Sequence, residues 1–197
     1  IAALGHMYGY RTNYKSEDTI YTFSPSVNIY KTIHDMAGND TINLSNYTDN
    51  TTISLIPGGV SEIGSNKLFW EGDNQQSGDY FVLSFKTDIE NYIGSSGNDD
   101  VTLNTLVIND ISTGIGDDVV RDGMPSDIIK TQAGDDSVYV TISELTEINS
   151  SIAIDGGPGY NWLIIERPTE TSSSLDFNLA DISCLLYTSD AADDTPC

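Results

Sequence analysis

Hydrophobic and polar positions alternate over short stretches along most of this chain. β-branched and aromatic residues dominate each stretch, and clusters of Asn, Asp, Gly, Ser and Thr separate one stretch from the next. An alternation with a period of two places the apolar side chains on one face of a β-strand. The pattern therefore predicts an all-β body, with strands at 19–23, 41–44, 51–55, 80–85 and 137–142.

The start of the chain follows a different period. Ile1, Leu4 and Met7 or Tyr8 share one face of a helix, and Gly9 is typical of a helix end. We expect a short helix over residues 1–9.

A longer repeat is superimposed on the strands. Gly-x-Asp, followed two residues later by an aliphatic residue, occurs four times, and two degenerate copies have Pro in place of Gly or Asn in place of Asp. Nine residues suit half a turn of a parallel β-solenoid, and eighteen suit a full turn. The final residues of the six copies are Asp40, Asp99, Asp118, Asp127, Asp136 and Asn161.

This spacing predicts which turns lie on the same edge of the solenoid. The turns that end at Asp99, Asp118 and Asp136 would stack along one edge, with the following aliphatic residues pointing inward. Asp127 would lie on the opposite edge, with neighbours near positions 109 and 145. Because no glycine turn occurs at those two positions, we expect one edge rich in ligands and one poor edge.

Such turns suit calcium, which binds six to eight oxygens from carboxylates and backbone carbonyls. Glycine allows a turn to expose its carbonyl groups, and the terminal Asp adds a charged ligand. The alternative is a β-solenoid or an ordinary β-sandwich in which Asp, Asn and Gly serve only as turn formers.

The net charge of the chain favours calcium binding over turns that bind no metal. The sequence has 30 acidic and 8 basic residues, a formal net charge of -22, and this excess opposes compaction unless cations neutralise it. The scattered Lys and Arg residues form no basic patch, which argues against nucleic acid and anionic membranes. No apolar run approaches the roughly 20 residues that a membrane-spanning helix needs.

The last fourteen residues, 184–197, continue none of these patterns. They resemble the translation of adapter DNA from a sequencing library, and we expect them to be an artefact; the alternative is a genuine acidic tail. Without them the chain has 27 acids against 8 bases, a charge of -19, and no cysteine.

Four blocks of the chain, taken together, resemble a known family, and they are residues 1–9, 17–23, 33–47 and 89–99. The nonapeptide pattern is similar to that of the repeats-in-toxin proteins. The order of the blocks resembles the junction between the catalytic domain and the C-terminal domain of serralysin-type secreted zinc metallopeptidases, truncated at both ends. Residues 66–84 look longer than the corresponding loop of that family.

The resemblance implies a calcium-binding parallel β-roll, with a short N-terminal helix left over from the preceding catalytic domain. On this view residues 1–20 are the end of the catalytic domain and the junction, 21–165 the roll, and 166–183 a linker or the end of the roll. Glu17, Ala37 and Ser95 stand where the family has glycine, which weakens carbonyl donation there. The implied calcium ligands are Lys15, Glu17, Thr19, Asp35, Ala37, Gly38, Asp40, Asp88, Glu90, Ser95, Gly97, Asp99, Gly114, Gly116, Asp118, Asp127, Gly134 and Asp136.

The resemblance also implies a function for the parent protein rather than for this segment. The zinc motif His-Glu-x-x-His is absent, and the chain has only His6 and His34, so we assign no catalytic residue here. Zinc and protein substrates would belong to the missing catalytic domain. The implied partners are several calcium ions and a type I secretion machinery, and the implied location is extracellular. Two alternatives stay open: a non-enzymatic repeats-in-toxin adhesin or surface protein, and the roll of another exported hydrolase.

Overall fold

The computed structural model describes residues 15–26, 29–64, 79–141 and 152–166 of the chain. All regular elements in these ranges are β-strands, which confirms the predicted all-β class. The described ranges contain no helix of the length and apolar character that crossing a membrane requires. The helix predicted over residues 1–9 lies outside the described residues.

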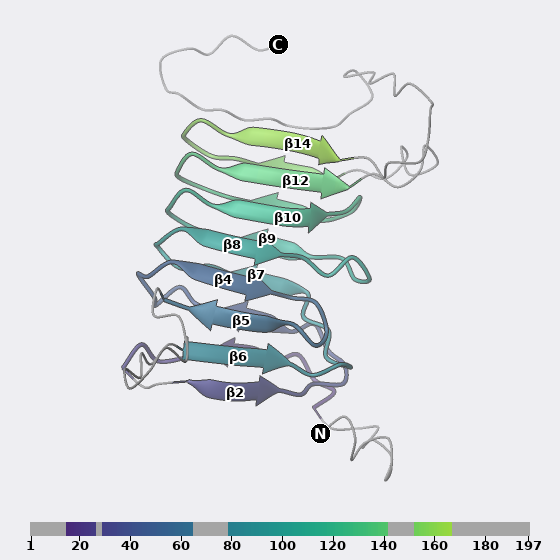
Figure 1. Ribbon diagram of the computed structural model, residues 1–197. Coiled ribbons are helices and arrows are strands. Elements are labelled where there is room, and N and C mark those ends of the chain that lie inside the picture. Colours follow the sequence, from purple (N-terminus) through teal and green to yellow (C-terminus); the bar gives the residue numbers. More distant parts are fainter. Residues whose placement is uncertain (1–14, 27–28, 65–78, 142–151, 167–197) are drawn as a thin grey trace, which may run out of the picture.

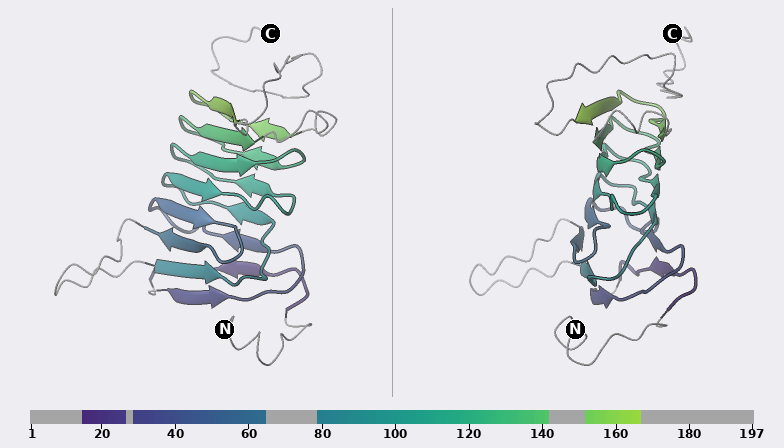
Figure 2. Two further views of the ribbon diagram at one scale, coloured as in Figure 1. Left: turned by 45° about the vertical axis from the view of Figure 1, so that its right-hand side comes forward. Right: turned by 90° about the vertical axis from the view of Figure 1, so that its right-hand side faces the viewer.

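The strands form two sheets that face each other as two layers (Figure 2). Sheet A has the spatial order β1-β3-β7-β9-β11-β13, and its strands are β1 (Ile20–Thr22), β3 (Thr41–Asn43), β7 (Asn91–Ile93), β9 (Asp110–Ser112), β11 (Ile128–Lys130) and β13 (Ala153–Asp155). Sheet B has the order β14-β12-β10-β8-β4-β5-β6-β2, and its strands are β2 (Tyr30–Ile33), β4 (Thr51–Ser54), β5 (Val60–Ile63), β6 (Asp79–Leu83), β8 (Asp99–Thr102), β10 (Val119–Gly123), β12 (Ser137–Thr141) and β14 (Trp162–Glu166).

From β7 to β14 the chain passes alternately between the two sheets (Figure 1). Each strand in this part pairs in parallel with the next strand of its own sheet. In sheet B the register aligns Val101 with Val120 and Val120 with Val138. The valines that follow Asp99, Asp118 and Asp136 by two positions therefore occupy the same position in successive layers.

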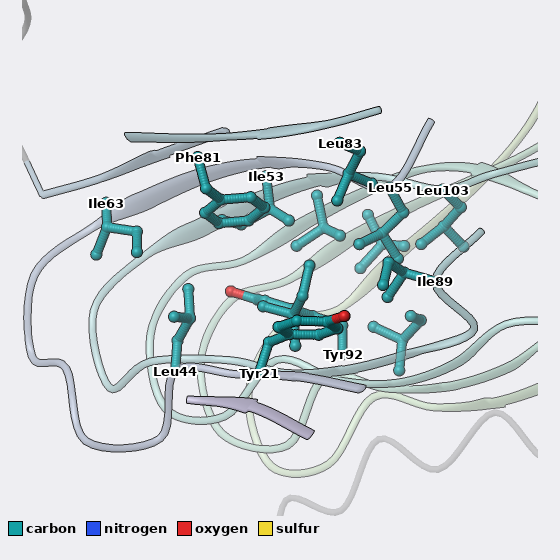
Figure 3. Close-up of a cluster of buried hydrophobic side chains, with 14 of the residues drawn as sticks. Tyr21, Leu44, Ile53, Leu55, Ile63, Phe81, Leu83, Ile89, Tyr92 and Leu103 are labelled. Atoms are coloured by element: carbon teal, nitrogen blue, oxygen red, sulfur yellow. The ribbon is translucent and has the colours of Figure 1, made fainter. Parts of the chain in front are cut away.

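These aligned side chains form the core between the sheets. Val101, Val120 and Ile129 have no exposed surface, and Val138 is 3% exposed. Towards β1 and β2 the space between the sheets holds larger side chains, including Tyr21, Phe81 and Tyr92 (Figure 3). Full burial of one such side chain contributes about 1.5–3 kcal/mol. The period of two in the sequence is thus the source of the core.

Sheet B departs from the parallel pairing that we predicted. β5 runs antiparallel to both β4 and β6, so the sheet is mixed. The reversal occurs at Pro57-Gly58, where Gly59 N donates to Ile56 O (2.8 Å) and Gly58 has a φ of 87°. Pro followed by a glycine of positive φ is typical of a type II turn. Pro57-Gly58 is a signal for this hairpin that our sequence reasoning overlooked.

Candidate metal centre

Four turns stack at one edge of the two sheets, which we call the glycine edge. Each turn precedes a strand of sheet B, and the edge lies on the left in Figure 1. A Cβ atom added to Gly116 would overlap Gly97 O, one on Gly134 would overlap Gly116 O, and one on Gly159 would overlap Gly134 O. Glycine is therefore required for this close approach of successive backbones. The four turns are residues 94–99, 113–118, 131–136 and 156–161.

The last residue of each turn joins an inner ladder of hydrogen bonds. Asp99 N donates to Asp118 Oδ1 (2.8 Å) and Asp118 N donates to Asp136 Oδ1 (2.9 Å). Asp136 N donates in turn to Asn161 Oδ1 (3.1 Å). The three acids that the sequence assigns to one edge are thus brought together, and Asn161 continues their row.

An outer ladder of hydrogen bonds runs beside the inner one. Its N–H groups donate to the turn before them in the chain, whereas those of the inner ladder donate to the turn after them. Its members precede the inner residues by one position, and each backbone N–H donates to the side chain of the preceding turn. The bonds are Asn98 N to Asn50 Oδ1 (3.0 Å), Asp117 N to Asn98 Oδ1 (3.1 Å), Asp135 N to Asp117 Oδ1 (3.0 Å) and Tyr160 N to Asp135 Oδ1 (2.9 Å). Asp and Asn are interchangeable in this outer row, because only an acceptor oxygen is needed there.

Two carboxylate oxygens of the inner row lack a partner. Within the described part of the chain, Asp118 Oδ2 and Asp136 Oδ2 are buried and accept no hydrogen bond. The hydroxyls of Thr113 and Thr131 lie near Asp118 and Asp136, respectively, but Thr113 donates to Thr131 O (3.1 Å) and Thr131 donates to Gly156 O (3.3 Å). A buried carboxylate oxygen without a donor is strongly unfavourable. The inner row therefore presents unsatisfied negative charge to the turns.

The pKa values of Asp118 and Asp136 reflect the same lack of donors. Burial, together with the charges of Asp99 and Asp136, raises the pKa of Asp118 to about 6. Burial also raises the pKa of Asp136, and the charges of Asp117 and Asp135 add to this effect. A cation beside these carboxylates would reverse the shifts, because it favours the ionised forms.

Asp99 differs from the two acids that follow it in the row. Its Oδ1 accepts hydrogen bonds from the hydroxyls of Thr51 (2.7 Å) and Ser95 (2.8 Å), and its Oδ2 accepts from Ser95 N (2.8 Å) and the Tyr92 hydroxyl (3.2 Å). Burial nevertheless raises the pKa of Asp99. Protein donors therefore surround this carboxylate, while Asp118 and Asp136 are left with a free oxygen each.

Asp127 lies on the opposite edge, which is formed by the turns that precede the strands of sheet A. Its Oδ1 accepts Asn109 N (2.8 Å) and Asn109 Nδ2 (3.1 Å), and its Oδ2 accepts Met124 N (2.7 Å). Both carboxylate oxygens thus have partners from the protein.

The second neighbour of Asp127 differs from our prediction. We expected it near position 145, but Asp127 O accepts Ala153 N (3.0 Å), and β13 pairs with β11 through Ile128 and Ala153. The paired residues Ile128 and Ala153 are 25 positions apart, more than the 18 positions of two nine-residue units, so a constant spacing gives the wrong partner. Glu144, the acid available near position 145, lies outside the described residues.

The predicted ligands nearest the N-terminus also come together on the opposite edge. Thr19 N donates to Asp40 Oδ1 (2.8 Å), Met36 N donates to Lys15 O (3.1 Å), and a Cβ on Gly38 would lie 2.8 Å from Glu17 O. Segment 15–19 therefore lies directly on the turn 35–40, where Ala37 is exposed and Asp35 is buried.

Glu90 joins this N-terminal group from a distant part of the chain. Asp40 N donates to Glu90 Oε2 (2.8 Å), and burial, with the charges of Asp35 and Glu90, raises the pKa of Asp40 to about 6. The sequence grouped Glu90 with Ser95, Gly97 and Asp99, but these three lie on the glycine edge.

The remaining polar candidates lie elsewhere. Asp88 is exposed, and its Oδ1 accepts Asn104 Nδ2 (3.0 Å); His34 Nδ1 lies 2.7 Å from Ser84 Oγ. Among residues 15–26, 29–64, 79–141 and 152–166, no three His, Cys, Asp or Glu side chains converge as a metal-binding group. Any ion at the glycine edge would therefore rely on turn carbonyls as well as carboxylates, as calcium does.

One residue of the glycine edge is strained. Gln132 has a φ of 68°, while the equivalent positions in the neighbouring turns are Gly114 (112°) and Gly157 (61°). We expect Gln132→Gly to stabilise the calcium-loaded chain by about 1 kcal/mol, because glycine adopts positive φ without a steric penalty. Thermal unfolding should show a melting temperature about 2–4 °C higher. An unchanged or lower melting temperature would contradict this account of the turn.

Comparison with known proteins identifies the group to which the chain belongs. The family described as "Peptidase M10 serralysin C terminal" matches residues 3–155, which is most of the sequence. The chain belongs to this family. It is also 32% identical over 111 residues to Serralysin C of Dickeya chrysanthemi.

The chain corresponds to only part of that relative. The aligned residues make up 50% of this chain and 21% of Serralysin C. The family match includes the N-terminal group around Asp40 and the turns that end at Asp99, Asp118 and Asp136, and it ends before the turn 156–161. Three of the four stacked turns therefore lie in the part of the chain that matches the family.

Proposed function

We propose that this segment is the calcium-binding β-roll of a secreted serralysin-like metalloprotease, and that calcium drives its folding. The observation that carries the proposal is the pair of buried oxygens, Asp118 Oδ2 and Asp136 Oδ2, that accept no hydrogen bond within the described residues. Calcium binds carboxylate and carbonyl oxygens, and both are available in stacked glycine turns. The donor set therefore fits this ion.

The glycine edge would hold the ions between successive turns. Asp118 and Asp136 would supply carboxylate ligands, and the carbonyl groups of Gly114, Gly116 and Gly134 would supply neutral ones. The close stacking of glycine backbones supports this assignment, because it places the carbonyl oxygen of one turn directly against the backbone of the next. A further ion would lie at the N-terminal group beside Asp40, whose pKa is raised by burial and by the charges of Asp35 and Glu90.

Calcium-dependent folding suggests a role in secretion. A site that exists only in the folded chain converts binding free energy into folding free energy. The chain would stay open at low calcium inside the cell, pass through a type I exporter, and close outside the cell. Residues 1–20 would then be the end of a zinc-dependent catalytic domain that cleaves protein substrates, and residues 21–165 the roll.

Three substitutions test the assignment of ligands. We expect Asp118→Asn and Asp136→Asn each to weaken calcium binding by at least about tenfold at the affected site, because each removes a charged ligand. Asp127→Asn should have a much smaller effect, since protein donors already satisfy both oxygens of Asp127. Isothermal titration calorimetry with calcium chloride measures the three affinities.

The comparison contains its own control. All three substitutions remove one negative charge from a buried Asp of the same stack, so a purely electrostatic effect would be similar in each variant. Equal losses of affinity in the three variants would refute the assignment of the ions to the glycine edge.

A further inference from the structure

A side-chain amide on the opposite edge is surrounded by oxygens in the way that a bound cation would be. Asn109 is fully buried, and its Nδ2 lies 3.1 Å from Asn104 O, 3.1 Å from Val107 O and 3.1 Å from Asp127 Oδ1. Two turn carbonyls and one carboxylate from the next turn thus converge on a single nitrogen. Calcium would hold the same types of oxygen at about 2.3–2.6 Å.

The orientation of this amide follows from its surroundings. The three neighbouring atoms are all acceptors, so the group that faces them must be the donating NH2. Asn109 Oδ1 points away from them and has no partner within the described residues. The Asn109 N–H and the Met124 N–H complete the shell of Asp127. Both oxygens of the carboxylate are therefore hydrogen-bonded by protein donors alone.

The last turn of the glycine edge repeats this arrangement. Asn161 follows Asp118 and Asp136 in the inner ladder, and its Oδ1 accepts Asp136 N as an aspartate would. Its Nδ2 donates to Gly156 O (2.9 Å) and Gly157 O (3.1 Å) of its own turn. Where Asp118 and Asp136 have an unpaired Oδ2, Asn161 therefore has a donor that satisfies the turn carbonyls.

We propose that Asn109 and Asn161 are internal substitutes for calcium, so that their turns close without an ion. The neutral amide NH2 supplies N–H donors to the oxygens that an aspartate turn would leave to a cation from solution. This inference rests on the proposed calcium-binding function and refines it: the residue that ends each turn determines whether that turn requires an ion. The number of ions is then lower than the number of stacked turns.

The test is to convert an amide turn into an aspartate turn. We expect Asn109→Asp to bind one calcium ion more than the wild-type chain, because the introduced carboxylate would join Asp127 and the two turn carbonyls as a ligand set. The calcium midpoint of folding should also shift to a higher concentration, since the new buried carboxylate disfavours the ion-free fold. Calorimetry with calcium chloride gives the number of ions, and circular dichroism gives the midpoint.

Asn98→Asp is the matched control. It adds the same charge at an exposed position of the outer ladder, where Asp117 and Asp135 already perform the same role, so the number of bound ions should equal that of the wild type and the midpoint should shift less than in Asn109→Asp. Asn161→Asp provides a second test in a less buried turn, in case Asn109→Asp does not fold even in calcium, and it should also gain one ion.

The outcomes separate this inference from the proposed function. A wild-type chain that binds no calcium overturns the proposed function. The wild-type chain could instead bind calcium while a folded Asn109→Asp or Asn161→Asp variant gains no ion and keeps the wild-type midpoint. That result overturns only the proposal that the asparagine amide takes the place of the ion.

Discussion

Removal of calcium with EDTA at pH 7.5 is expected to abolish most of the β-sheet signal in far-ultraviolet circular dichroism. Burial raises the pKa of Asp40 and of Asp118 to about 6, above the usual value of about 4. For an acid whose pKa is raised by folding, protonation favours the fold below pH about 4, and this stabilisation is lost as the pH rises through 6. At pH 7.5 both groups are ionised and destabilise the ion-free fold.

Calcium is expected to restore the signal at millimolar or lower concentration. An ion present at a hundred times its dissociation constant contributes about 2.7 kcal/mol of stability at each site. Two sites at the glycine edge would together contribute about 5 kcal/mol, which matches the lower range of total stability for a folded domain. Calcium titration of the EDTA-treated chain measures this recovery.

Magnesium and sodium chloride serve as controls for this experiment. Magnesium gives up its water reluctantly and prefers a strict octahedral shell, so the same concentration should restore little structure. Sodium chloride at the ionic strength of the calcium buffer tests whether simple screening is enough. A spectrum that does not change on addition of EDTA would refute calcium-driven folding.

Gly134→Ala is expected to destabilise the calcium-loaded chain by more than about 3 kcal/mol. The new Cβ would overlap Gly116 O, a backbone atom that cannot move unless adjacent layers separate. The φ of Gly134 is 151°, which adds backbone strain for any residue with a Cβ. Losses of this size arise from overpacking and from strain at special backbone conformations. Denaturant unfolding in saturating calcium measures the change.

Gly64→Ala separates the two causes. Gly64 has a positive φ of 87°, but a Cβ there would meet only Asp49 Cβ at 3.8 Å, an ordinary contact. This control should lose only about 1–2 kcal/mol, the cost of the left-handed conformation. If both variants lose the same stability, the close approach of the glycine backbones does not contribute, and the stacking argument for Gly134 is wrong.

Local patterns allowed much of this architecture to be predicted from the sequence. The period of two indicated the all-β class and the inward positions of Val101, Val120 and Val138. The interval of about eighteen residues placed Asp118 and Asp136 on one edge, because parallel pairing brings equivalent positions of successive layers into register. These features repeat along the chain, so a short stretch of sequence is sufficient to specify each of them.

Only the tertiary structure determined which side chains meet across long separations. Asp40 and Glu90 are fifty residues apart and still adjacent, because the hairpin that contains β5 enlarges sheet B while β3 and β7 pair directly in sheet A. Ala153, the second neighbour of Asp127, is likewise set by the pairing of β11 with β13. A constant interval along the sequence does not predict it.

The tertiary structure also determined which acids are left without a donor. The sequence presents Asp99, Asp118, Asp127 and Asp136 as equivalent ends of repeated turns. The fold gives Asp99 the hydroxyls of Thr51 and Tyr92 in addition to Ser95 of its own turn, and gives Asp127 the amide of Asn109, whereas Asp118 and Asp136 each retain one unpaired oxygen within the described residues. The sequence thus determines where the acids recur, while the need of each acid for a cation depends on donors that neighbouring layers bring to it.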